Sequence, residues 1–200
     1  MLKPDDERMD RGTASPPAML PDAHLVRMAQ RDRAAFVHLY DRYVNQIYRY
    51  CARRVGSDRA EDITSTAFFH AMRSLDRFDP DRAGFRPWLF AIAHNALIDA
   101  TRERNHAPLD AISLPADDHD LDEHVIAIDQ SVRLEQAVAA LPPDQFAVVS
   151  LRLEGLTGPE IAEATGKSHE AVRSLQHRAF IRLKRALGPD SDQHPEKTRS

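Results

Sequence analysis

The sequence predicts an all-α protein of two small helical domains joined by an acidic linker. Apolar residues recur at three- and four-residue steps in two separate stretches, as the buried faces of helices require. Between these stretches, prolines and acidic residues break the periodicity. We therefore expect a disordered extension at 1–21, a helical domain at 22–106, a flexible linker at 107–130, a second helical domain at 131–187 and a disordered tail at 188–200.

Turn-forming residues set the helix boundaries of the first domain. A buried stripe that includes Phe36 indicates one long helix, which Gly56 ends. Asp58, followed by an acid three residues later, predicts a capping box at the start of the next helix. Turn formers fill 76–84, and Pro87 then suits the first turn of a final helix.

The second domain contains the motif that decides its class. Residues 163–172 read EATGKSHEAV, and their Gly-Lys-Ser resembles the end of a phosphate-binding loop. Such a loop needs a glycine five positions earlier, after a strand, whereas Ile161 stands there within a predicted helix. The pattern therefore disfavours a nucleotide site.

A helix-turn-helix accounts for the same residues. Two helices that cross closely need a small residue at their contact, which Ala162 provides, and Gly166 suits a turn that requires positive φ. Ser168 caps the second helix, while Val172 and Leu175 hold it against the first. The open alternative is a plain helical hairpin.

The polar face of the second motif helix is the predicted DNA-binding surface. Side chains near the start of such a helix reach base edges in the major groove, and later cations meet phosphate. The candidate contacts in this domain are Thr157, Ser168, His169, Glu170, Arg173, Ser174, His177, Arg178, Lys184 and Arg185. A solvated charged face is the plainer alternative, but the turn in front of the helix favours DNA binding.

Charge is distributed unevenly along the chain. The net charge is -4, and seven acidic side chains without any lysine or arginine lie within 107–130, which leaves +3 for the rest. Residues 168–187 carry five basic side chains against one acid. This separation is typical of a basic binding module joined to an anionic tether.

Several other classes of protein are disfavoured. The longest apolar run, 88–93, is too short to cross a bilayer, and the N-terminus lacks the apolar core of a secretory signal, so we expect a cytoplasmic protein. The single cysteine, Cys51, excludes a disulfide within the chain and predicts a buried thiol. His119 and His124 lack metal-ligand spacing on a rigid element. Because no nucleophile has a base partner, we expect no enzyme activity, no catalytic residue, no metal, no cofactor and no small-molecule substrate.

Two long stretches resemble a known family. LPPDQFAVVSLRLEGLTGPEIAEATGKSHEAVRSLQHRAFIRLKRAL is similar to region 4, the promoter-reading C-terminal domain of bacterial RNA polymerase sigma factors. AFVHLYDRYVNQIYRYCARRVGSDRAEDITSTAFFHAMRSLDRFDP, followed by FRPWLFAIAHNALIDATRER, is similar to their region 2. The order of the regions and the absence of an intermediate domain resemble the two-domain, extracytoplasmic-function (ECF) group, over about residues 22–104 and 131–187.

This resemblance implies roles for the first domain as region 2. Glu61, Asp62 and Phe68 would contact core RNA polymerase. The loop at 76–86 would capture a base flipped from the minus-ten element. The following helix would contact that element through His94, Asn95, Ile98, Thr101, Arg102 and Arg104. Region 4 would read the minus-thirty-five element, and the implied partners are core polymerase, promoter DNA and an anti-sigma factor.

Three rival functions stay open at this stage. A sigma-like protein that only titrates an anti-sigma factor needs no positively charged helix face to enter a DNA groove. Arg173 and Arg178 nevertheless provide such a face. A conventional helix-turn-helix regulator leaves the helix at 88–104 unexplained, and an enzyme with a DNA-binding appendage ranks last. The chain departs from the usual family pattern at 64–66, which reads Thr-Ser-Thr, and at His94, where arginine is frequent.

Trp88 and the acidic linker each allow both a structural and a functional interpretation. Trp88 stands among apolar residues, so it is interpreted as a core residue rather than a base-stacking one. The acidic linker is interpreted as a self-repelling tether. The family resemblance adds that its carboxylates could mimic nucleic acid in the RNA path of the polymerase.

Overall fold

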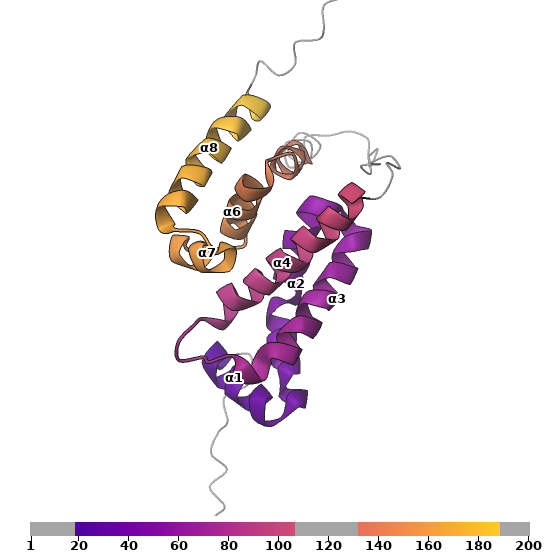
Figure 1. The fold of residues 1–200 in the computed structure, drawn as a ribbon, viewed down its shortest axis with the longest axis vertical. Coiled ribbons are helices and arrows are strands. Elements are labelled where there is room, and N and C mark those ends of the chain that lie inside the picture. The colour runs from indigo at the N-terminus through magenta and orange to yellow at the C-terminus, as the bar shows by residue number, and fades with distance from the viewer. Residues whose placement is uncertain (1–18, 107–131, 189–200) are drawn as a thin grey trace, which may run out of the picture.

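The computed structural model describes residues 19–106 and 132–188, and every regular element within these ranges is a helix (Figure 1). The first half contains α1 (Asp22–Arg31), η2 (Arg33–Phe36), α2 (Val37–Val55), α3 (Ser57–Ser74), η3 (Leu75–Arg77) and α4 (Phe85–His106). The second half contains a helical segment at 132–139, then α6 (Pro143–Leu153), α7 (Gly158–Thr165) and α8 (His169–Leu187). The predicted all-α class is confirmed. The predicted extension and tail fall almost entirely, and the acidic linker entirely, outside the described residues.

The first half is a bundle in which α2 and α3 form an antiparallel pair against α4 (Figure 1). Most of the long stripe predicted for α2 is buried, including Tyr43, Ile47 and Tyr50, but its member Tyr40 is exposed. The capping box predicted at Asp58 is wrong. The chain instead turns at Gly56, with φ 79° and ψ 171°, and α3 starts at the next residue without a side-chain cap.

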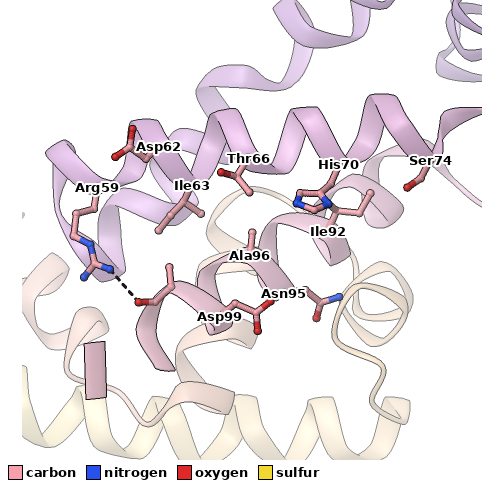
Figure 2. Close-up of a pocket in the computed structure, with 11 residues that line it drawn as sticks. Arg59, Asp62, Ile63, Thr66, His70, Ser74, Ile92, Asn95, Ala96 and Asp99 are labelled. Carbon is pink, nitrogen blue, oxygen red and sulfur yellow. Dashed lines mark hydrogen bonds between the residues drawn. The ribbon is translucent and has the colours of Figure 1, made fainter. Parts of the chain in front are cut away.

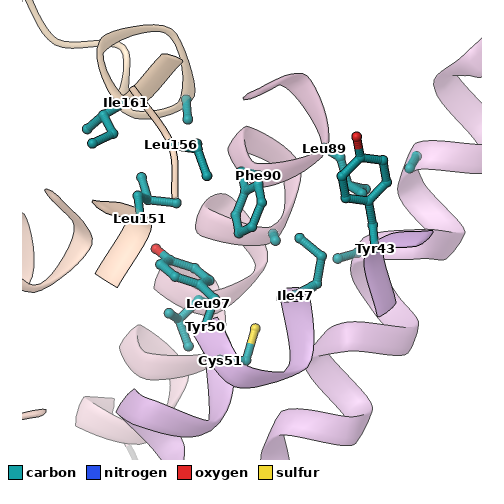
Figure 3. Close-up of a cluster of buried hydrophobic side chains, with 14 of the residues drawn as sticks. Tyr43, Ile47, Tyr50, Cys51, Leu89, Phe90, Leu97, Leu151, Leu156 and Ile161 are labelled. Atoms are coloured by element: carbon teal, nitrogen blue, oxygen red, sulfur yellow. The ribbon is translucent and has the colours of Figure 1, made fainter. Parts of the chain in front are cut away.

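The two halves of the chain share one hydrophobic core. Helix α4 packs against α7, and α2 contacts α6. Figure 3 shows Tyr50 and Phe90 of the first half beside Leu151, Leu156 and Ile161 of the second, and all five are fully buried. Full burial of such a side chain contributes about 1.5–3 kcal/mol relative to leaving it exposed, and both halves contribute to the burial here. The sequence predicted two domains on a tether, but not that they would pack together.

Ion pairs and hydrogen bonds reinforce this packing. The carboxylate of Glu154, at the end of α6, accepts hydrogen bonds from Arg49 at 2.8 Å and Arg53 at 2.6 Å. The guanidinium of Arg86 donates to the Glu154 carbonyl oxygen. Arg54 donates to the carbonyl oxygen of Leu141 at 3.0 Å. We refer to the arrangement with α4 on α7 and α2 on α6 as the closed arrangement.

Candidate DNA and polymerase interfaces

The second half of the chain contains a helix-turn-helix formed by α7 and α8. Thr157 and Glu160 form a reciprocal capping box, in which the Glu160 carboxylate accepts from the Thr157 backbone N–H at 2.7 Å. Gly166 ends α7 in the left-handed conformation, with φ 65° and ψ 22°. The Ser168 hydroxyl then accepts from the Ala171 N–H at 3.2 Å and starts α8. The Gly166 turn and the Ser168 cap are those that the sequence predicted.

Burial holds the two motif helices in register. Ala162 on α7 and Val172, Leu175 and Ala179 on α8 are buried, so the apolar side of α8 faces the domain. The opposite side faces solvent, because a helix with one apolar stripe leaves its remaining surface exposed.

The exposed side of α8 brings together five of the predicted DNA contacts. A shallow open depression is lined by Gln176 and by the predicted residues Glu170, Arg173, Ser174, His177 and Arg178. Arg178 donates from Nε to the Ser174 carbonyl oxygen at 3.3 Å, which directs its guanidinium along the helix. Glu170, Ser174 and His177 offer hydrogen-bonding groups of different chemistry, and Arg173 and Arg178 beside them are cations. This combination suits contacts with base edges and with the phosphates that flank them.

The other predicted contacts of this domain lie at the ends of its helices. His169 follows the Ser168 cap, while Lys184 and Arg185 lie in the exposed last turns of α8. The Thr157 hydroxyl is engaged with Glu160 at 2.7 Å, so this side chain serves the α7 cap. Burial alone would raise the pKa of the Glu160 carboxyl, but hydrogen bonds from Thr157 and the nearby Arg86 and Arg152 lower it overall.

The predicted DNA contacts on helix α4 differ in exposure. Asn95 and Arg102 are exposed, whereas Ile98 and Thr101 are half-buried, and Thr101 donates its hydroxyl to the Ile98 carbonyl oxygen at 2.8 Å. The side chain of Arg104 lies outside the described part of the chain. Among the predicted contacts on α4 whose side chains are described, Asn95 and Arg102 are therefore the most accessible to DNA.

The expectation that His94 faces DNA is wrong for the closed arrangement. Its Nδ1 lies 2.8 Å from the Tyr50 hydroxyl, at the junction of the two halves. Burial lowers the pKa of His94, nearby Lys167 lowers it further, and Asp144 opposes the shift. The imidazole is therefore neutral at pH 7 and packs at the junction. Sequence periodicity placed it on a helix face but could not show that α6 and α7 would cover that face.

A groove of about 540 Å³ runs between α3 and α4 (Figure 2). Asn95 lines it from α4, together with Asp99, and Asp62 and His70 line it from α3. Arg59 closes one end by donating to the Ala100 carbonyl oxygen at 3.0 Å. The groove thus joins one predicted DNA contact and one predicted polymerase contact on a single surface.

The predicted polymerase contacts on α3 separate into surface and core. Glu61 and Asp62 are exposed. Phe68 is only 4% exposed, and its ring lies 4.8 Å from that of Tyr40, so its prediction as a surface contact is wrong. The exposed aromatic is its neighbour Phe69, at 50% exposure, with the Arg73 guanidinium 5.6 Å from the ring centroid. Helical periodicity with Ile63, Ala67 and Ala71 places Phe68 on the apolar face of α3, and the structure confirms that placement.

The loop between α3 and α4 forms a small pocket beside Trp88. Its lining includes Arg77, Phe78, Asp79 and Arg82. The rings of Phe78 and Trp88 lie 4.5 Å apart between centroids. Trp88 is half-buried against the core, as predicted, but it also lines this pocket with one edge.

Two further kinds of feature are absent from the described residues. No helix in 19–106 or 132–188 is both long and apolar enough to span a membrane. The same residues contain no group of three or more His, Cys, Asp and Glu side chains suited to a metal ion. Cys51 is buried as predicted, and burial raises the pKa of its thiol to about 12.

An exposed, cation-bearing helix behind a left-handed glycine turn, on an all-helical scaffold, defines a helix-turn-helix protein. Comparison with known proteins gives the family. The model described as "Sigma-70 region 2" matches residues 39–107, and that described as "Sigma-70, region 4" matches residues 131–183. The chain belongs to the ECF group of RNA polymerase sigma factors.

Individual relatives support this assignment. The ECF RNA polymerase sigma factor BldN of Streptomyces coelicolor is 37% identical over 84% of this chain, and the chain spans 66% of the length of BldN. The RNA polymerase sigma factor CarQ of Myxococcus xanthus is 34% identical over 77% of this chain and 90% of its own length. The solved structure of CnrH in complex with the cytosolic domain of CnrY is 26% identical, with a TM-score of 0.66 over 86% of this chain and 99% of that one.

Proposed function

We propose that this chain directs core RNA polymerase to specific promoters, with region 2 at 22–106 and region 4 at 131–187. The observation that carries the proposal is the exposed polar face of α8 behind the Gly166 turn, combined with a second DNA-facing helix, α4, in the other half. A regulator that reads DNA with one motif has no use for the second face. The chain would catalyse no bond change itself and would act in the cytoplasm with the polymerase.

The division of labour follows from which residues are exposed. On α8, Arg173 and His177 would read the edges of minus-thirty-five base pairs, and Arg178 would hold phosphate. On α4, Asn95 and Arg102 would contact the minus-ten element, beside the Trp88 pocket that would receive a flipped base.

Polymerase would bind on the exposed ridge of α3. Glu61 and Asp62 supply negative charge, and Phe69 supplies an apolar side chain in place of the buried Phe68. An anti-sigma partner belongs to the same proposal, and it is supported by the structural relative CnrH, which was solved with the cytosolic domain of CnrY.

Run-off transcription tests the proposal. Core polymerase is incubated with genomic DNA fragments, with and without the purified chain, and the transcripts are sequenced. We expect new, discrete start sites that depend on the chain. An unchanged transcript pattern, or full activity from region 4 alone, would overturn it.

A further inference from the structure

The most unusual group in the structure is a buried carboxylate at the junction of the two halves. The Glu154 side chain is only 1% exposed. Its two oxygens are each bonded to a different arginine of α2, with Arg49 on Oε2 and Arg53 on Oε1. Arg53 is itself 17% exposed, so this ion pair is largely removed from water.

The backbone at Glu154 is held from a second direction. Arg86, at the start of α4, donates to the carbonyl oxygen of Glu154 and, at 3.5 Å, to that of Gly155. These three arginines come from two helices of region 2, whereas both acceptor residues belong to region 4. We call Glu154 with Arg49, Arg53 and Arg86 the Glu154 cluster.

A buried carboxylate is expensive unless it is paired, and pairing here is possible only across the junction. If the halves separate, the ion pairs of Glu154 are lost, but water can then solvate Glu154 and the arginines. This hydration offsets the free energy lost with the ion pairs, whereas separating an apolar contact brings no such compensation. The cluster therefore favours one docking geometry while leaving the separated state accessible. A seam held only by Leu156, Ile161 and Phe90 would lack this property.

The closed arrangement is incompatible with simultaneous contact to both promoter elements. The minus-ten and minus-thirty-five elements lie about 25 base pairs apart, which is roughly 85 Å of duplex at 3.4 Å per pair. Helices α4 and α8 both pack on α7, and packed helix axes lie 8–10 Å apart, so the axes of α4 and α8 approach to about 20 Å. In the closed arrangement His94 is half-buried near Lys167 and Asp144 of the other half.

We propose that the Glu154 cluster holds the free chain in the closed arrangement and that joining the polymerase requires this cluster to open. The proposal rests on the proposed function for its consequence, although closure itself can be measured without polymerase. Region 4 is thus an intramolecular partner of region 2, and Glu154 is the residue that selects this partner surface.

Spin labels measure closure directly. Cysteines are introduced at the exposed Ser65 of α3 and Arg182 of α8, and the native Cys51 is fully buried and stays unlabelled. Pulsed electron paramagnetic resonance of the full chain then reports the distance between the two halves. We expect one short, narrow distribution for the otherwise unchanged chain.

The test variant removes the charge and keeps the shape. Glu154→Gln should raise the ratio of open to closed chains at least tenfold, seen as a broad, longer distance. The matched control is Glu163→Gln, an exposed glutamate on α7, which should leave the distribution unchanged. Arg53→Glu should open the chain, and Arg53→Glu combined with Glu154→Arg should close it again.

Folding is monitored by circular dichroism. If Glu154→Gln loses helix content, the milder Arg49→Gln, which removes one of the two ion pairs at a half-exposed arginine, decides the question. A distance distribution that stays short and narrow in these folded variants would overturn the proposal. So would a broad distribution in the unchanged chain.

Polymerase binding separates this proposal from the proposed function. When only a minor state of a protein can bind, the apparent affinity rises in proportion to the population of that state. The affinity of Glu154→Gln for core polymerase should therefore increase by about the same factor as its population of open chains. An opened variant with unchanged affinity would contradict the requirement for opening. If neither the unchanged nor the opened chain binds polymerase, the proposed function fails, while the label distances still decide whether the cluster closes the chain.

Discussion

The hydroxyl of Tyr50 and Nδ1 of His94 lie 2.8 Å apart where α2, α4 and α6 meet. Tyr50 is fully buried, and its ring also lies 6.0 Å from that of Phe146 in region 4. A histidine that looked like a DNA contact in sequence is thus a neutral hydrogen-bonding partner of Tyr50 within the first half, at the surface where the two halves pack. Its titration links pH to their packing.

Acidification should destabilise the chain through His94. Burial lowers the folded-state pKa below 6.5, so between that pKa and 6.5 the unfolded chain binds more protons, and the free energy of unfolding falls as pH falls. Lys167 lowers the pKa of His94 and Asp144 raises it, so the effects of these two charges partly cancel. In urea unfolding, the free energy of unfolding should fall less between pH 7.5 and pH 5.5 for His94→Gln than for the unchanged chain. Equal losses would remove His94 as the cause.

Arg173 should contribute to promoter choice. If its guanidinium is bidentate to a guanine, Arg173→Ala should cost about 1–3 kcal/mol and relax preference at one base pair. Arg178→Ala, on the same helix, is the matched comparison and should weaken all sequences alike while reducing the salt slope by about one. Competition binding to promoter libraries randomised in the minus-thirty-five element, at several salt concentrations, measures the base preference and the overall affinity of both variants. Unchanged promoter selection in Arg173→Ala would take this residue out of the interface.

Asn95 should act in promoter opening rather than in polymerase binding. It lines the α3–α4 groove and is exposed, so Asn95→Ala removes a hydrogen-bonding amide without disturbing the core. We expect slower open-complex formation, followed by 2-aminopurine fluorescence in the minus-ten element, and unchanged binding to core polymerase. Parallel loss of both activities would contradict the division of labour.

The adjacent phenylalanines of α3 should behave in opposite ways. Phe68→Ala opens a cavity beside Phe36 and Tyr40 and should cost about 3–5 kcal/mol of unfolding free energy. Phe69→Ala removes an exposed ring and should leave stability nearly unchanged while weakening polymerase binding. Thermal unfolding and a polymerase-binding assay on both variants distinguish them, and a stable Phe68→Ala chain would argue against the core assignment.

Gly166 should tolerate asparagine better than alanine. A Cβ atom at this position would meet no other atom within 4 Å, so the cost of substitution arises from the φ of 65° alone. Gly166→Ala should lose about 1 kcal/mol, and Gly166→Asn less, because asparagine visits the left-handed region more readily. Equal stability of the two variants in urea would show that the turn relaxes.

Local chemistry determined much of this protein before any tertiary contact was known. The Gly166 turn and the Ser168 cap each depend on residues within a few positions of one another, so the sequence predicted both of them. The exposed α8 face followed from helical periodicity. The expected cap at Asp58 failed because Gly56 let the chain turn two residues earlier.

The all-helical fold, the helix-turn-helix and the family resemblance could all be predicted from the sequence, as could the inward side of Phe68. The half-burial of His94 and the pairing of Glu154 with Arg49 and Arg53 became visible only in the packed fold. The difference comes from separation along the chain. Residues about one hundred positions apart, such as Arg53 and Glu154, meet only when the apolar faces of two separate helix pairs find each other, and no local pattern encodes that contact.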